Sequence, residues 1–290
     1  MSEPREHRLK TPEGDICWFE WGAQSSKPSL LLLHATGFHA RLWDRVVAAL
    51  PAGTHVIAPD HRGHGRSFRP ATLANWAANA DILLPLVDGL GSHPLIGCGH
   101  SMGAHVLTRL ASQRPAAFRH IVLIDPVIMD PSFYEGEAAR PIPDPAEHPV
   151  ARRRNSWLDA EEMRARFADR PPYANWDPRV LADYCTFGLL PAETGEGLEL
   201  ACPPALEASI YQNAMRINPH EWLHYLVVPS TVIRAPTGER GGALDFSLSP
   251  TWIGLGAAIG AGRDELWSDN SHFIPMENPA RVAALLAELL

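Results

Sequence analysis

Ser101 stands at the centre of the stretch GHSMG (residues 99–103), between an apolar run, PLIGCGHS, and an amphipathic segment, GAHVLTRLASQ. These flanks predict a strand that turns sharply into a helix at the serine. A strained turn of this kind leaves no room for bulk on either side, which explains Gly99 and Gly103. The dipole and free N–H groups of the helix N-terminus favour developing negative charge. We therefore interpret Ser101 as a nucleophile.

His272 is the expected general base. A serine hydroxyl is not nucleophilic at pH 7 without one. His272 lies in SDNSHFIPMENP (residues 268–279), between the last predicted strand and the last predicted helix. The carboxyl end of a strand is where open parallel sheets bind ligands. Its position late in the chain also suits the order nucleophile, acid, histidine.

A second loop, HATGFH (residues 34–39), follows the first long apolar run. Acyl transfer develops an oxyanion, which needs two positioned donors. We expect these to be the backbone N–H groups of Met102 and Thr36. The expected substrate pocket takes residues from the loops and from a later aromatic-rich segment: His34, Phe38, His100, Trp157 and Trp176.

The elements that position these residues alternate along the chain. Apolar runs at residues 29–35, 54–60, 94–101, 120–125, 230–235 and 264–269 are typical of strands buried on both faces. Helix-compatible segments at residues 41–50, 75–90, 103–113 and 280–290 come between or after them. This alternation predicts a parallel sheet with helices on both faces. The opening HRLKTPEGDICWFEWG predicts a hairpin that forms an antiparallel edge.

The pattern changes to helix signals and prolines between residues 129 and 228. There, Ser156 or Asp159 is a candidate helix N-cap, Pro171 a stop, and Asp177 precedes a proline at a second helix start. We therefore divide the chain into a core (residues 1–128 and 229–290) and a helical cap (residues 129–228), whose aromatic side chains pack it on the core or line the pocket.

Composition limits the partners. The 290 residues carry a net charge of −8, with 46% apolar and 20% charged residues. Nucleic-acid binding is not expected, because it needs a basic surface, and the short basic run ARRRN (residues 151–155) is interpreted as a solvated face. No apolar segment predicts a leader or membrane insertion, so a cytoplasmic location is expected. Four dispersed cysteines predict free buried thiols and no metal site.

The motifs LLLHATGFH, APDHRGHGRS, GHSMG, LIDP and SHFIPMENP together resemble those of capped α/β-hydrolases, in the family's order and approximate spacing over essentially the whole chain. The resemblance implies a mostly parallel eight-stranded sheet with helices on both faces and a cap, and it implies no metal or cofactor. DHRGHGRS resembles a family loop that we interpret as mainly structural. One departure is Ala35, where the family often has glycine.

Three carboxylates compete to orient His272. Many α/β-hydrolases carry the acid after the penultimate strand in a pattern like G-x-x-D, but VIRAPTGERGG has no aspartate, and Glu239 is its nearest carboxylate. Asp125, which ends the predicted strand HIVLID, is the position used by some members. Asp245 lies several residues beyond the strand. We favour Asp125, with Glu239 as its competitor.

The resemblance implies hydrolysis of a carboxylic ester or lactone, through an acyl-enzyme on Ser101 with His272 as base. Haloalkane dehalogenases and soluble epoxide hydrolases of this fold have aspartate at the nucleophile position, which is serine here. Carbon–carbon bond hydrolysis of diketone-like compounds and a ligand receptor with slow turnover are the alternatives. The expected partner is a small-molecule substrate, with the chain a monomer or homodimer.

Overall fold

An eight-stranded sheet forms the centre of the computed structural model, which describes residues 3–71, 73, 76–90, 93–136, 140, 144–192, 195–239 and 245–290. Its strands lie in the order β1-β2-β4-β3-β5-β6-β10-β11. Their bounds are β1 Arg5–Thr11, β2 Gly14–Trp21, β3 Leu30–Leu33, β4 Val56–Pro59, β5 Leu95–His100, β6 Phe118–Ile124, β10 Ser230–Arg234 and β11 Arg263–Leu266. From β4 to β11 all neighbours are parallel. The hairpin β1–β2 is the predicted antiparallel edge, and β2 also pairs antiparallel with β4.

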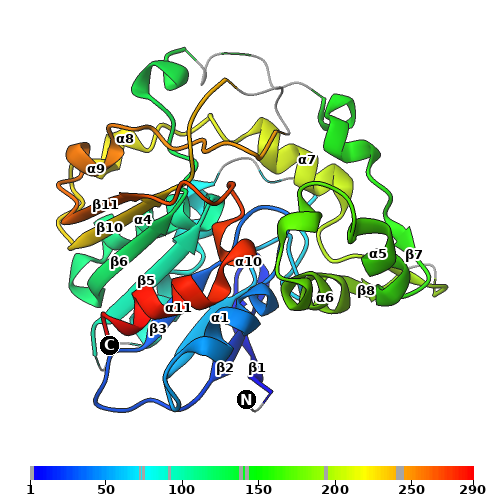
Figure 1. The fold of residues 1–290 in the computed structure, drawn as a ribbon, viewed down its shortest axis with the longest axis horizontal. Coiled ribbons are helices and arrows are strands. Elements are labelled where there is room, and N and C mark those ends of the chain that lie inside the picture. Colours follow the sequence, from blue (N-terminus) through cyan, green and yellow to red (C-terminus); the bar gives the residue numbers. More distant parts are fainter. Residues whose placement is uncertain are drawn as a thin grey trace.

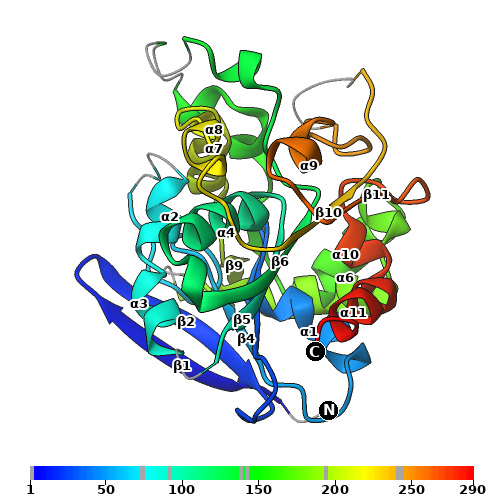
Figure 2. The ribbon, with the colours of Figure 1, turned by 90° about the vertical axis from the view of Figure 1, so that its left-hand side faces the viewer.

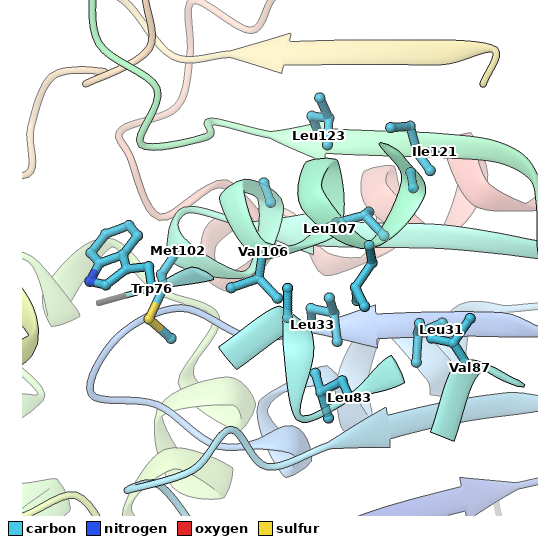
Figure 3. Packing of buried hydrophobic residues seen from close by; sticks show 14 of the residues in the cluster. Leu31, Leu33, Trp76, Leu83, Val87, Met102, Val106, Leu107, Ile121 and Leu123 are labelled. Atoms are coloured by element: carbon cyan, nitrogen blue, oxygen red, sulfur yellow. The ribbon is translucent and has the colours of Figure 1, made fainter. Parts of the chain in front are cut away.

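Helices cover both faces of this sheet, as the strand pattern predicts (Figure 2). One face carries α2 Ala77–Asp81, α3 Leu84–Gly89 and α4 Met102–Gln113, and the other carries α1 Asp44–Ala49 and α11 Pro279–Ala287. Alternate side chains of β3 point to opposite faces. Leu31 and Leu33 pack with α3 and α4 (Figure 3), whereas Leu30 and Leu32 pack with α1 and α11. The run of four leucines is therefore buried on both sides.

Two expected helices are interrupted. The segment at residues 41–50 begins as a 3₁₀ turn, η1 Ala40–Trp43, before α1. The segment at residues 75–90 forms α2 and α3 as separate short helices, with Pro85 in the first turn of α3, where the missing N–H costs no helical hydrogen bond. Asn75, the first residue of that expected segment, and residues 240–242 after Glu239 lie outside the described residues.

The segment between β6 and β10 contains α5 Ala160–Phe167, α6 Pro178–Phe187, α7 Pro204–Gln212 and α8 His220–Leu223. Asp159 caps α5 by accepting a hydrogen bond from the Glu162 N–H, and Asp177 caps α6 in the same manner. Three short strands, β7 Ser156–Trp157, β8 Leu189–Pro191 and β9 Leu198–Leu200, form a small antiparallel sheet that helix and proline signals do not predict. Ser156 is thus in a strand. Figure 1 shows α5, α6 and this sheet to the right of the large sheet.

Short elements complete the fold after β10. They are α9 Leu255–Ala258, which precedes β11, and α10 Ile274–Glu277, which precedes α11. The four cysteines are free and buried, as predicted.

Candidate active site

Ser101 occupies a strained turn between β5 and α4. Its φ of 57° and ψ of −118° place a non-glycine residue in a region that L-residues rarely adopt. A Cβ atom on Gly99 would lie 2.5 Å from the Gly103 carbonyl oxygen, and one on Gly103 would collide with the Leu33 carbonyl oxygen. Both glycines are therefore required by close backbone contact. This is the predicted strand-to-helix turn.

Ser101, His272 and Asp125 form a chain of hydrogen bonds. The Oγ of Ser101 lies 3.0 Å from Nε2 of His272, and Nδ1 of His272 lies 2.6 Å from Oδ2 of Asp125. The exposed fractions of the three residues are 6%, 4% and 0%. With the Nδ1 proton on the Asp125 side, Nε2 is free to accept the serine proton. The arrangement therefore has the geometry for base-assisted attack by a serine.

Asp125 follows β6 with φ of 43°, and its carboxylate is fully engaged. Besides contacting His272, Oδ1 accepts hydrogen bonds from the Ala235 N–H (2.9 Å) and the Ser249 hydroxyl (2.5 Å). Of the competing carboxylates, Glu239 is exposed, and Asp245 binds the backbone N–H of Ser247. The structure thus brings Asp125 to His272.

The HATGFH loop lies against the start of α4. Thr36 faces the same cavity as Ser101, and its hydroxyl donates to Sδ of Met102 at 3.3 Å. Met102 is the first residue of α4, so its backbone N–H has no acceptor within the helix. These positions suit the two expected oxyanion donors.

Histidines of the 60–67 loop, together with His34, hold the HATGFH loop in place. The Gly37 N–H donates to Nε2 of His64, and the His61 N–H donates to Nε2 of His34, both at 3.0 Å. Nδ1 of His34 in turn donates to the Ala35 carbonyl oxygen at 2.8 Å. These bonds need neutral imidazoles, because a protonated ring nitrogen cannot accept. The loop of the DHRGHGRS motif therefore positions the backbone of the neighbouring loop.

Burial lowers the pKa of six histidines, since desolvation penalises the imidazolium. They are His34, His39, His61, His64, His100 and His105. The pKa falls to about 3 for His39 and His61 and to about 4 for His64 and His105. All six are neutral in the folded protein at pH 7.

A cavity of about 170 Å³ opens beside Ser101 and His272. Its walls are mainly aromatic: Phe38, Tyr173, Trp176, Tyr211, Phe246 and Phe273. Its polar lining also includes Arg153 and Glu207. Its volume is close to the ~150 Å³ of an engineered cavity that holds benzene. The cavity therefore fits a small substrate group.

Of the expected pocket residues, Phe38 and Trp176 line this cavity, and the other three do not. His34 is buried beneath its own loop. His100 donates from Nε2 to the His272 carbonyl oxygen at 2.7 Å and so helps to hold the backbone of the expected base in place. Trp157 packs against Phe167 within the segment between β6 and β10. The prediction was wrong for these three, because sequence proximity to the site does not determine which way a side chain turns.

The sequence patterns did not predict the pair of half-buried Arg153 and buried Glu207. Nη1 of Arg153 lies 2.6 Å from Oε2 of Glu207, and Nη2 donates to the Tyr184 hydroxyl at 3.0 Å. Burial lowers the pKa of Arg153, but Glu207 together with Tyr184 and Tyr173 outweighs burial and raises that pKa overall. Burial raises the pKa of Glu207, although Arg153 opposes this rise. The interpretation of the basic run as a solvated face is therefore wrong for Arg153, and no local pattern distinguishes it from the exposed Arg154.

The chain belongs to the alpha/beta hydrolase family, whose sequence pattern matches residues 30–285. It is thus a hydrolase of this fold. The chain is similar to Lipase LipV of Mycobacterium tuberculosis, with 29% identity over 274 residues that cover 92% of this chain and 94% of the lipase.

Two solved structures share its fold. E-2-(acetamidomethylene)succinate hydrolase has a TM-score of 0.75 and 19% identity, with coverage of 99% of this chain and 98% of that one. A thioesterase domain from the curacin biosynthetic pathway has a TM-score of 0.74 and 18% identity, with coverage of 99% and 100%. No helix within the described ranges is long and apolar enough to cross a bilayer. Among the described residues, no cluster of three or more histidine, cysteine, aspartate or glutamate side chains is arranged to hold a metal ion.

Proposed function

We propose that this protein is a serine-dependent carboxylic ester hydrolase that acts on small esters or lactones. The observation that carries the proposal is the hydrogen-bonded chain from Ser101 through His272 to Asp125 at the wall of a small, largely aromatic cavity. The similarity to Lipase LipV along almost the whole chain supports an ester substrate. The cavity volume favours a short acyl or single-ring group over a long fatty acyl chain.

In the proposed mechanism, Oγ of Ser101 attacks the ester carbonyl carbon while Nε2 of His272 takes the hydroxyl proton. The N–H groups of Met102 and Thr36 stabilise the oxyanion that develops on the carbonyl oxygen. His272 then returns the proton to the leaving alcohol, which departs as the acyl-enzyme forms. Water, deprotonated by His272, attacks the acyl-enzyme and releases the acid and free Ser101. Asp125 fixes the imidazole tautomer and stabilises the imidazolium in both halves.

A fluorophosphonate probe, used together with a substrate panel, tests this proposal. The probe is expected to add one label to the wild-type protein and none to folded Ser101→Ala, because phosphonylation needs an activated serine. The panel of 4-nitrophenyl esters, lactones and diketones assigns the reaction class, with the short esters or lactones expected to turn over fastest. Equal labelling of both proteins would refute the assignment of Ser101 as the nucleophile. Faster turnover of diketones than of esters would indicate carbon–carbon bond hydrolysis. A single burst without cycling would indicate a receptor.

A further inference from the structure

An ion pair lies in the wall of the substrate cavity, apart from Ser101 and His272. Glu207 and Tyr211 are four residues apart on α7 and therefore share one face of this helix. The ring of Tyr211 lies 6.2 Å from that of Phe246, which stacks on His272 at 5.8 Å. This wall runs from the base, across two aromatic rings, to the carboxylate of Glu207 and its partner Arg153.

Both members of the pair line the cavity and carry hydrogen-bonding groups. Arg153 directs one N–H group at Glu207 and one at Tyr184, and its guanidinium carries further donors. Oε2 of Glu207 accepts from Arg153. Oε1 of Glu207 lies close to the backbone of Gly37: a Cβ atom added to Gly37 would be 2.5 Å from this oxygen. The cavity therefore presents a donor and an acceptor side by side.

Stability alone does not account for this pair. Desolvating two charges costs about as much as their attraction returns, so a buried ion pair contributes little to folding compared with an apolar pair of similar size. A different ion pair, Arg45 with Asp183, joins α1 to α6 outside the cavity. The Arg153–Glu207 pair is instead placed where a bound substrate would contact it.

We propose that Arg153 and Glu207 form a subsite for an uncharged substrate group that both donates and accepts hydrogen bonds, such as a carboxamide or hydroxyl. This inference rests on the proposed ester hydrolysis and names its substrate class. The carbonyl oxygen of a carboxamide accepts from Arg153 while its N–H donates to Glu207. A carboxylate in the same place faces Glu207 and an ammonium faces Arg153, so like charges disfavour both. The compensated pair thus selects polar but neutral groups.

Matched 4-nitrophenyl esters test the subsite. Succinamate and glutaramate carry a terminal carboxamide, 4-methylpentanoate and 5-methylhexanoate are their hydrocarbon isosteres, and the hydrogen succinate and glutarate esters carry a carboxylate. For wild-type protein, with Ser101→Ala as background, the better carboxamide ester is expected to exceed its isostere by about 10- to 100-fold in kcat/KM. The isostere displaces water from Arg153 and Glu207 without forming hydrogen bonds to either of them. The carboxylate esters should be the slowest.

Two variants locate the effect. Arg153→Met/Glu207→Leu removes both charges at similar volume and is expected to make the hydrocarbon ester the better substrate. Arg154→Met changes the neighbouring exposed arginine, which binds Glu162 instead, and should keep the wild-type ranking.

The results separate the subsite from the proposed chemistry. Hydrolysis of the hydrocarbon esters without a carboxamide preference in the wild type overturns the subsite but leaves ester hydrolysis intact. A preference for the carboxylate esters, or a carboxamide preference that survives in the folded double variant, also overturns it. Failure to hydrolyse any ester overturns the proposed function and the subsite together.

Discussion

Asp125→Asn is the substitution that best separates a catalytic carboxylate from a turn aspartate. Asparagine keeps the size of the side chain and adopts positive φ more readily than most residues, which matters because φ is 43° here. Its amide must still satisfy the Ala235 N–H and the Ser249 hydroxyl, which both donate to Oδ1 of Asp125. The amide oxygen therefore faces those two donors, and the NH₂ group turns to His272.

That orientation inverts the histidine tautomer. Nδ1 of His272, 2.6 Å from the carboxylate in the wild type, would have to accept from the NH₂ group. The ring proton would then sit on Nε2, 3.0 Å from Oγ of Ser101, where it blocks uptake of the serine proton. Loss of the correct tautomer costs about 10⁴ in kcat in a serine hydrolase triad, which corresponds to about 5 kcal/mol of transition-state stabilisation.

Steady-state hydrolysis of a short 4-nitrophenyl ester measures this effect on variants whose folding is checked by circular dichroism and thermal unfolding. For Asp125→Asn, kcat is expected to fall by at least about 100-fold, a conservative fraction of the 10⁴-fold figure. Glu239→Gln is the matched control and should stay within about tenfold of wild type, since that carboxylate is exposed and Nδ1 of His272 contacts Asp125. The reverse ranking would refute the reasoning and move the acid to Glu239.

Trp176→Leu enlarges the cavity and is expected to shift the preferred substrate to a longer acyl chain without changing the pH profile. Trp157 does not line the cavity, so Trp157→Leu should keep the wild-type substrate ranking. The same ranking in both variants would mean that Trp176 does not shape the pocket. Gly37→Ala should lower kcat/KM by at least about tenfold, because φ is 77° and the new Cβ would press on Glu207 beside the oxyanion loop. Gly53→Ala, with φ of 80° and open space around it, should cost stability alone, so equal kinetic losses in the two glycine variants would argue against a loop displacement. The urea midpoint of the wild type should decrease as the pH is lowered from 7 to 5, because burial lowers the pKa of all six histidines, and the stability present above the unfolded pKa near 6.5 is lost as the pH falls. For His64 and His105, whose pKa falls to about 4, the loss reaches up to about 3 kcal/mol each. Burial raises the pKa of Asp44 and of Asp60 to about 6, which offsets part of this loss of stability. An unchanged urea midpoint would contradict the prediction.

The sequence was most informative where the chemistry depends on neighbours in the chain. The glycines around Ser101 and the apolar run before it predict the strained turn from local sterics, and the structure contains that turn. The alternation of apolar runs with helical segments predicts the sheet and its two layers of helices, because a strand buried on both faces must be apolar throughout. The position of His272 after the last strand likewise follows from chain order.

Tertiary structure alone decided which distant side chains meet. The contact between Asp125 and His272 spans 147 positions, and only the packing of β6 beside β10 brings the Asp125 carboxylate, and not that of Glu239, to the imidazole. The same limit explains Arg153, which turns into the cavity while its neighbour Arg154 stays in solvent. The orientation of a side chain depends on partners in other elements, here Glu207 on α7. A local sequence pattern does not identify those partners.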